Sequence, residues 1–221
     1  MRRLIEQKSS ILELQLLHTQ LQPHFTFNIL NTLGSMIYDD NKEEAYSYLH
    51  KFSSLLRVVL ETDIDWKWSL NDEIFFVEKY ISLENERFLG KYLHEFVIED
   101  NVNMDFLIPK MIIQIFVENA ISHGLRTKRS DNNILISISM AESYLRIRIE
   151  DNGIGRNKAS RLKSNRNGKS IRLIREFIDS YNKNNKNKFR LKISDLKPGL
   201  DEPGTRVEIE IPVEFSEKKN E

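Results

Sequence analysis

Hydrophobic residues at three- and four-residue spacing predict that the chain begins with two helices. The first stripe runs through residues 2–38, at Leu4, Ile11, Leu14, Leu17, Leu21, Phe25 and Ile29. A turn signal, Asp-Asp-Asn, follows at 39–41, and a second stripe extends from Ala45 to Leu60. Two helices with a short connection predict an antiparallel hairpin. Since one hairpin is too thin to bury both stripes, we expect it to pair with a second copy.

After residue 68 the pattern changes to a mixture of helices and alternating strands. Ser69, followed by Asp72 and Glu73, has the spacing of a capping box and predicts a helix to about residue 89. A proline at 109 and a glycine at 124 predict the start and stop of a helix over 108–125. Strands are predicted at 94–99, 133–140, 144–150, 188–194 and 205–212, with a short helix at about 170–181. The fold class is therefore α+β: a helical hairpin followed by an α/β sandwich.

Composition and charge narrow the classes of function. The 33 basic and 33 acidic residues give net zero charge, so no overall field recruits nucleic acid. The absence of cysteine excludes disulfides and thiol catalysis. No apolar stretch approaches the roughly 18 residues of a membrane span. We expect a soluble chain that is the soluble part of something longer.

The stretch EDNGIGR at 150–156 is the first candidate binding motif. Asp151 can accept a hydrogen bond from an exocyclic amine such as that of adenine, and Gly153 and Gly155 allow the backbone to approach a ligand closely. Taken alone the motif is weak, because Asp-Asn-Gly is also a common hairpin turn.

A second candidate motif is FVENAISHG at 116–124. On a helix, Asn119 and His123 are one turn apart and share a face. An asparagine oxygen is a suitable Mg²⁺ ligand, and His123 could contact a phosphate. The alternative is that both residues merely line the exposed side of an amphipathic helix.

The segment 156–169 contains six basic residues and no acidic one. It is interpreted either as a solvated loop or as a mobile lid over a polyphosphate. Gly168, just ahead of the helix predicted at 170–181, would let a phosphate approach the helix N-terminus.

QLQPHFTFNILN at 20–31 places a proline inside a predicted helix, at a cost of about 3 kcal/mol. His24 follows Pro23 directly, and Asn28 lies one turn later. A lone helical histidine is usually structural. A neutral imidazole near pH 7, however, can act as a nucleophile towards phosphorus.

Together these motifs resemble the LytS-type sensor histidine kinases over nearly the whole chain. QLQPHFTFNILN is similar to the family's phosphoacceptor sequence Q-x-x-P-H-F-x-F-N-x-L-N, and PKMIIQIFVENAISHG at 109–124 to its N-box. SLNDEIFFVEKYISLENERF at 69–88 resembles the linking helix, whose pattern begins L-x-x-E. DNGIG and GTRVEIEIP resemble the later boxes of the ATP-binding domain.

The resemblance implies an ATP-dependent protein-histidine kinase with Mg²⁺ as cofactor. Residues 1–65 would be the dimerisation and phosphotransfer hairpin, a four-helix bundle in the homodimer. Residues 66–215 would be an ATP-binding domain of the gyrase, Hsp90, kinase and MutL (GHKL) type, and 216–221 a disordered tail. The implied catalytic residues are His24, which accepts the γ-phosphoryl group, and Asn28. The implied ligand-binding residues are Asn119 (for Mg²⁺ and ATP), His123, Asp151, Gly153, Gly155, Gly168 and Thr205.

The family resemblance also implies partners. The phosphoryl group would pass to an aspartate in the receiver domain of a response regulator. The chain would be the cytoplasmic fragment of a protein in the bacterial inner membrane, with a membrane-anchored sensor domain before it and no direct contact with nucleic acid.

Two departures from the family pattern leave alternatives open. GKSIRL at 168–173 has Ser170 and Leu173 where the family has glycine and asparagine, which could alter the lid. Phe25 stands where the larger branch of histidine kinases has an acid, so the general base is unassigned. The alternatives are a catalytically weak dimeric scaffold and a GHKL ATPase without phosphohistidine.

Overall fold

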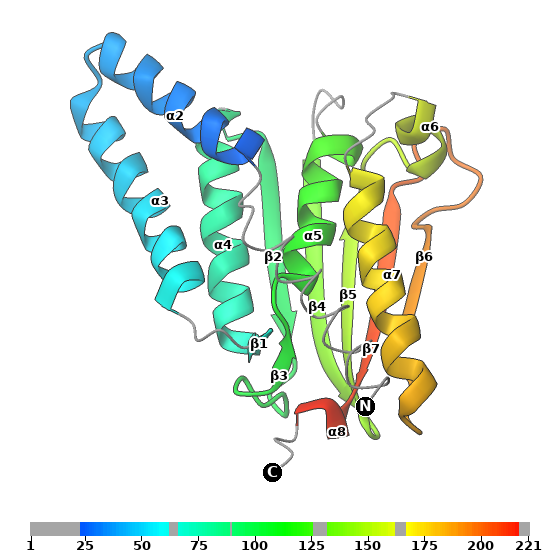
Figure 1. Cartoon of the computed structure of the whole chain (residues 1–221). Coiled ribbons are helices and arrows are strands. Elements are labelled where there is room, and N and C mark those ends of the chain that lie inside the picture. Colours follow the sequence, from blue (N-terminus) through cyan, green and yellow to red (C-terminus); the bar gives the residue numbers. More distant parts are fainter. Residues whose placement is uncertain (1–22, 62–65, 89, 126–131, 162–166, 217–221) are drawn as a thin grey trace.

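The computed structural model describes residues 23–61, 66–88, 90–125, 132–161 and 167–216 (Figure 1). The first elements are α2 (Pro23–Tyr38), α3 (Lys42–Glu61), β1 (Lys67–Ser69), α4 (Leu70–Arg87), β2 (Tyr92–Ile98), β3 (Leu107–Pro109) and α5 (Ile112–Asn119). The remaining ones are the π-helix η1 (Ala120–Leu125), β4 (Asn132–Ala141), β5 (Tyr144–Asp151), α6 (Arg156–Arg161), α7 (Asn167–Asn184), β6 (Arg190–Asp195), β7 (Thr205–Pro212) and α8 (Val213–Ser216).

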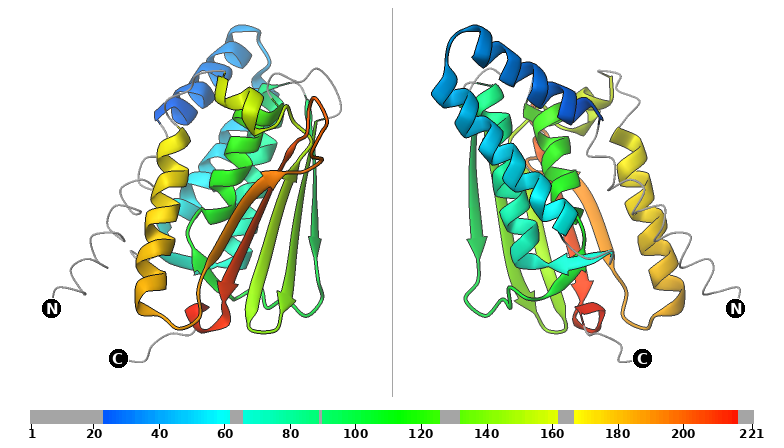
Figure 2. Two further views of the ribbon diagram at one scale, coloured as in Figure 1. Left: turned by 90° about the vertical axis from the view of Figure 1, so that its right-hand side faces the viewer. Right: turned by 60° about the vertical axis from the view of Figure 1, so that its left-hand side comes forward.

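Five strands form one sheet in the order β2-β4-β5-β7-β6. The β2–β4 pair is parallel, whereas the β4–β5, β5–β7 and β6–β7 pairs are antiparallel. Helices α4, α5 and α7 cover one face of this sheet, as the edge-on view in Figure 2 shows. The predicted α+β class and the largely antiparallel sheet are confirmed.

Alternation of side chains along the strands separates the covered face from the solvent face. Ile134, Ile136 and Ile138 of β4 are all buried beneath the helices. The opposite face carries ion pairs across neighbouring strands, including Arg146 with Glu210. An alternating pattern with one buried side is the expected result of a helix layer on one face only.

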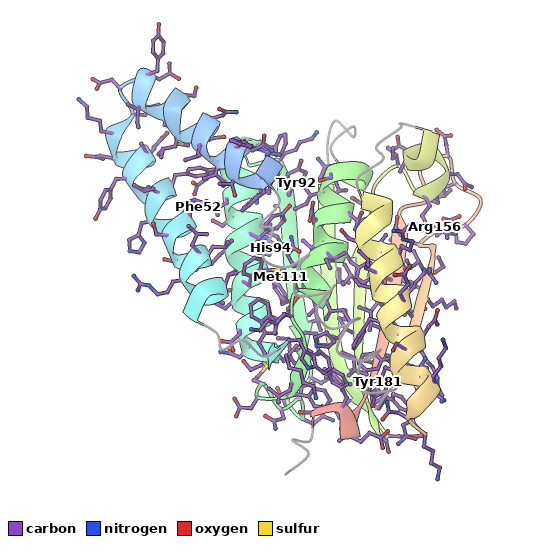
Figure 3. All side chains as sticks on the ribbon, in the orientation of Figure 1. Phe52, Tyr92, His94, Met111, Arg156 and Tyr181 are labelled. Carbon is purple, nitrogen blue, oxygen red and sulfur yellow. The ribbon has the colours of Figure 1, made fainter. Side chains whose placement is uncertain are left out.

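The hairpin of α2 and α3 packs against α4 of the same chain (Figure 1). The ring of Phe25 lies 5.1 Å from that of Tyr80 and 6.4 Å from that of Phe52, which is labelled in Figure 3. Ile29 and Leu55 are also fully buried in the same core. Within the described residues, the hydrophobic stripes of the two helices are thus partly covered within the chain, because α4 supplies apolar surface at Phe25, Ile29 and Leu55.

Large hydrophobic side chains remain exposed on the other faces of the hairpin. They are Phe27, Leu30, Ile37, Tyr38, Tyr46 and Leu49. The division of the chain near residue 65 stays a prediction, and residues 1–22 lie outside the described ranges. The prediction that Pro23 lies inside a longer helix depends on those residues and stays a prediction.

The predicted start of α4 is confirmed at its N-cap. The Ser69 hydroxyl accepts a hydrogen bond from the backbone N–H of Asp72 at 3.0 Å. This satisfies one of the backbone donors that the first turn of a helix leaves without a partner.

The predicted helix over 108–125 is wrong at its start, whereas its end at Leu125 is confirmed. Pro109 ends strand β3, where it pairs with Lys67, and α5 begins only at Ile112. A proline is tolerated at the end of such a short strand, since it lacks the N–H that a central strand needs. From residue 120 the α-helix gives way to the π-helix η1.

Between β5 and β6 the sequence predicts one loop and a short helix, and the structure differs from this prediction. Residues 156–161 form the helix α6, and α7 starts at Asn167 and runs to Asn184. Buried Leu173, Ile174 and Phe177 explain why α7 is held on the sheet. At the C-terminal end, Ser216 closes α8 and does not belong to a tail, while 217–221 lie outside the described ranges.

Within the described ranges, no helix combines the length and the apolar character that crossing a membrane requires.

Candidate functional site

Asp151 is the last residue of β5 and is 6% exposed, on the face of the sheet that the helices cover. Its register partners are Ile134 on β4 and Thr205 on β7. Its Oδ1 accepts a hydrogen bond from the backbone N–H of Gly153 at 2.9 Å. This bond closes a tight turn and fixes the direction of a buried carboxylate.

The turn after Asp151 is packed against the end of η1. The backbone N–H of Ile154 donates to the carbonyl of Gly124 at 2.9 Å. A Cβ at Gly153 would lie 2.3 Å from backbone atoms of Gly124, and one at Gly124 would lie 2.8 Å from Oδ1 of Asp151. Two segments far apart in sequence therefore meet around one carboxylate, at positions that admit no side chain.

Gly204 completes this glycine cradle, which we define as Gly124, Gly153 and Gly204. Its N–H donates to the carbonyl of Gly153 at 3.0 Å, and a Cβ on it would lie 2.2 Å from the carbonyl oxygen of Asp151. Its φ of +65° also favours glycine. Thr205 follows directly and so is held opposite Asp151.

Gly124 and Gly204 are site residues that the sequence reasoning missed. Gly124 was given only a helix-stop role, although it stands in the His-Gly pair that ends the N-box. Gly204 precedes Thr205 in a stretch already matched to the family, so the signal was present. By contrast, the predicted Gly155 adopts a φ of +79° and packs against Pro203.

Asn119 is the last residue of α5 and is half-buried. Its Nδ2 donates to the backbone carbonyl of Ile115 at 2.5 Å, so the amide nitrogen is turned back towards α5. The backbone of His123 lies in η1, but its side chain lies outside the description. These two residues are joined by a π-helix, which bonds residue i to i+5, and not by the α-helix that the spacing predicts; that their side chains share a face stays a prediction.

The two described ends of the segment 156–169 differ from the loop or lid that the sequence predicts. Gly168 and Ser170 both lie within the first turn of α7, so Gly168 does not stand ahead of that helix as predicted. On α6, Arg156 (labelled in Figure 3) forms an ion pair with Asp195 at 3.1 Å, and Lys158 with Asp201 at 2.6 Å. Two of the six basic residues are thus paired with acids, one at the end of β6 and one in the loop that follows it. Residues 162–166 lie outside the described ranges.

The start of α2 lies beside α4 (Figure 1). His24 is in the first turn of α2, while its side chain lies outside the description; Asn28 is half-buried one turn later. Phe25 contacts Tyr80. Burial, then the charges of Glu84 and Glu118, raises the pKa of Tyr80 well above its ordinary value.

Two residues that act on Tyr80, Phe25 and Glu118, are each next in sequence to a predicted site residue. Glu118 directly precedes Asn119, and Phe25 directly follows His24. His24 and Asn119 are thus each the sequence neighbour of a residue that acts on Tyr80, Phe25 through ring contact and Glu118 through its charge.

The arrangement suits a ligand that carries a hydrogen-bond donor. A buried, oriented carboxylate can accept from an amine of a flat base, and the glycine cradle lets that base approach the backbone.

Residues 12–92 match the family described as Histidine kinase. The sensor protein LytS of Staphylococcus epidermidis is 36% identical over 143 residues, which cover 65% of this chain and 24% of LytS. LytS of Streptococcus mutans is 33% identical over 147 residues, 66% of this chain and 25% of that protein. The sensor histidine kinase/phosphatase LytS of Staphylococcus aureus is 35% identical over the same shares.

The chain thus spans about a quarter of the length of these curated relatives. Among solved structures, the histidine kinase AdeS of Acinetobacter baumannii matches with a TM-score of 0.47 and 14% identity, over 85% of this chain and 94% of that one. The mycobacterial sensor histidine kinase MprB matches with a TM-score of 0.45 and 11% identity, over 66% and 95%. From the family match and the relatives in sequence, the chain belongs to the histidine kinase family, with the LytS sensor proteins as its relatives.

Proposed function

We propose that this chain is the kinase core of a two-component sensor, which phosphorylates His24 with ATP and passes the phosphoryl group to an aspartate of a response regulator. The observation that carries the proposal is the buried Asp151 carboxylate inside a cradle of three glycines. The presence of His24 within the segment that matches the histidine kinase family supports the second half of the proposal.

The residues around the cradle have the chemistry that ATP requires. Asp151 would accept the adenine amine, and Thr205, Gly153 and Gly155 would bound the base. His123 and Gly168 would lie on the phosphate side, through roles that the family resemblance assigns to them. A carboxylate that accepts from N6 favours adenine over guanine, which presents a carbonyl oxygen at the equivalent position.

Asn119 would hold Mg²⁺ through Oδ1, since its amide nitrogen is already bonded to Ile115. Mg²⁺ binds through few protein oxygens together with phosphates and waters, and it neutralises charge during phosphoryl transfer. A neutral ring nitrogen of His24 would bond to the γ-phosphorus as the bond to ADP breaks. The protein mainly positions the reacting atoms and stabilises charge.

The partners follow from the same proposal. The exposed apolar side chains of α2 and α3, among them Phe27, Leu30 and Leu49, offer a surface on which a second hairpin could pack into a four-helix bundle. A receiver domain would then approach His24. A membrane-anchored sensor domain would precede this chain, which would lie on the cytoplasmic side.

Incubation with Mg²⁺ and γ-labelled ATP tests the proposal. We expect label on the protein that is stable to alkali and labile to acid, and that is absent from His24→Gln. His50→Gln is the matched control, because His50 lies on the exposed side of α3 and should leave labelling unchanged.

The other outcomes distinguish the alternatives. Free phosphate without labelled protein would point to an ATPase without phosphohistidine. ATP binding without either product, in a preparation that includes any activating sensor segment, would point to a signalling scaffold. No binding of ATP would contradict the proposal as a whole.

A further inference from the structure

Glu73 is a fully buried carboxylate on α4 that the proposed chemistry does not use. It accepts four hydrogen bonds. Oε2 accepts from Trp68 Nε1 at 2.5 Å and from Met111 N at 2.7 Å, and Oε1 accepts from Ile113 N at 2.7 Å and Gln114 N at 2.9 Å. Both oxygens are therefore occupied by donors, and three of those donors belong to the backbone at the start of α5.

These backbone groups are the ones that a helix start leaves without partners. Met111, labelled in Figure 3, stands at the N-cap with a φ of 61° and makes no side-chain capping bond. Glu73 supplies the cap instead, from a helix about 40 residues away in sequence. A negative charge at a helix N-terminus also interacts favourably with the helix dipole.

The helix held in this way leads to the nucleotide site. α5 spans Ile112–Asn119, about 12 Å at 1.5 Å per residue. Asn119 is its last residue, and η1 continues from it to Gly124, which contacts Asp151. A short helix moves as one unit, so a shift of its start also shifts Asn119 and the Gly124 side of the cradle.

We propose that Glu73 is a positioning residue for the nucleotide site: by anchoring the start of α5 to α4, it holds Asn119 and Gly124 at their working distance from Asp151. The inference rests on the proposed function, since it takes MgATP as the ligand. It assigns a task to the glutamate of the L-x-x-E pattern that the motif alone leaves unexplained.

The first test compares MgATP binding by the wild-type chain and by Glu73→Gln, using calorimetry. Glutamine keeps the size of the side chain but turns an NH₂ group towards backbone N–H donors. We expect affinity for MgATP to fall about tenfold to a hundredfold, as when a supporting partner of a metal-binding group is removed. Glu78→Gln is the matched control, because Glu78 is exposed on the same helix and should bind as the wild type does.

A second control separates positioning from loss of stability. Leu55→Ala removes a fully buried side chain on α3, a helix that packs on α2 and α4. At a temperature where all variants are folded, Leu55→Ala should bind MgATP as tightly as the wild type. If Leu55→Ala weakens binding as much as Glu73→Gln does, the role of Glu73 is only structural and the inference is overturned.

The third measurement needs no variant. Hydrogen exchange of the backbone N–H groups of Met111, Ile113 and Gln114 should slow on addition of MgATP to the wild type, because binding holds α5 in the geometry that Glu73 caps. Unchanged exchange at these three amides, in a chain that demonstrably binds MgATP, would overturn the inference. It would do so even if Glu73→Gln failed to fold.

The outcomes keep the two proposals apart. A wild-type chain that binds no nucleotide overturns the proposed function and this inference with it. A wild-type chain that binds MgATP, together with Glu73→Gln of equal affinity, overturns the inference alone.

Discussion

At the scale of single residues, the site depends on positions where a side chain is missing. Gly153 faces the backbone of Gly124 so closely that a Cβ has no space, and Gly204 stands in the same relation to Asp151. Such contacts are with backbone atoms, which cannot rotate away as a flexible side chain can. Packing density, more than the freedom of glycine in φ, selects glycine at Gly124 and Gly153.

Gly153→Ala tests this close approach. The added methyl group must push the turn away from Gly124, and overpacking of this kind costs about 1–3 kcal/mol. We expect MgATP affinity to fall by about tenfold, since 1.4 kcal/mol corresponds to that factor. Titration calorimetry gives the comparison, with Gly34→Ala as the control because a Cβ there meets open space. Wild-type affinity in Gly153→Ala would show that the turn has room to spare.

At the scale of elements, helix α5 begins where a side chain from α4 allows it to begin. The local sequence favours an earlier start at Pro109. In the structure Pro109 belongs to β3, which pairs with β1, and Glu73 caps the backbone from Met111 onwards. Burial raises the pKa of the Glu73 carboxyl to about 7, although hydrogen bonds from Gln114 and Trp68 lower it.

The raised pKa predicts how stability depends on pH. The folded pKa of about 7 lies above the ordinary value of 4.5, so the folded chain binds more protons than the unfolded chain between these values. The stabilisation that comes from proton binding at Glu73 is therefore fully present below pH 4.5 and is lost as pH rises through 7. Relative to Glu73→Gln, the wild type should lose up to about 3 kcal/mol of unfolding free energy across this window.

Denaturant unfolding of both variants at several pH values between 4.5 and 8 measures that difference. The comparison with Glu73→Gln cancels the titration of all groups that the two chains share. A difference that stays constant, or that favours the wild type increasingly at high pH, would contradict the prediction.

At the scale of the whole molecule, the hairpin and the sheet domain share one hydrophobic core. Phe25 and Leu55 belong to the same buried cluster as Tyr80 and the β4 isoleucines. The boundary predicted near residue 65 therefore crosses a continuous apolar interior. The exposed apolar residues of α2 and α3 lie outside this core and leave a surface for a second copy.

A shared core predicts that the two parts unfold together. Leu55→Ala should destabilise the chain by about 2–5 kcal/mol. Both tryptophans, Trp66 and Trp68, lie beyond the hairpin, so their fluorescence reports on the second part of the chain. We expect the fluorescence transition to shift with the far-UV circular dichroism transition. A hairpin that melts separately, with the fluorescence midpoint unchanged, would contradict the shared core.

Much of the fold follows from local patterns in the sequence. Alternation in 205–212 gives β7 with its observed ends, and Ser69 caps α4 through the predicted bond. The hydrophobic stripe through Phe25 and Ile29 faces the core as predicted. These features depend on backbone geometry and on neighbours within a few residues, so a sequence displays them directly.

The candidate site was only partly visible in the sequence. Asp151 and Gly153 stand in a recognisable motif, and the structure places them together with Thr205. Gly124 and Gly204 were missed as members of the cradle, because their importance lies in contacts between segments far apart along the chain.

The sequence by itself determined the alternating strands, the cap of α4, the family and the candidate residues, since each depends on residue types at short spacing. Only the tertiary structure decided that α4 covers the hairpin, that Glu73 fixes the start of α5, and that three glycines enclose Asp151. The physical reason is that an apolar surface packs against whichever apolar group is nearest in space. A buried backbone N–H group likewise donates to whichever acceptor is nearest. That neighbour is not encoded by spacing along the chain.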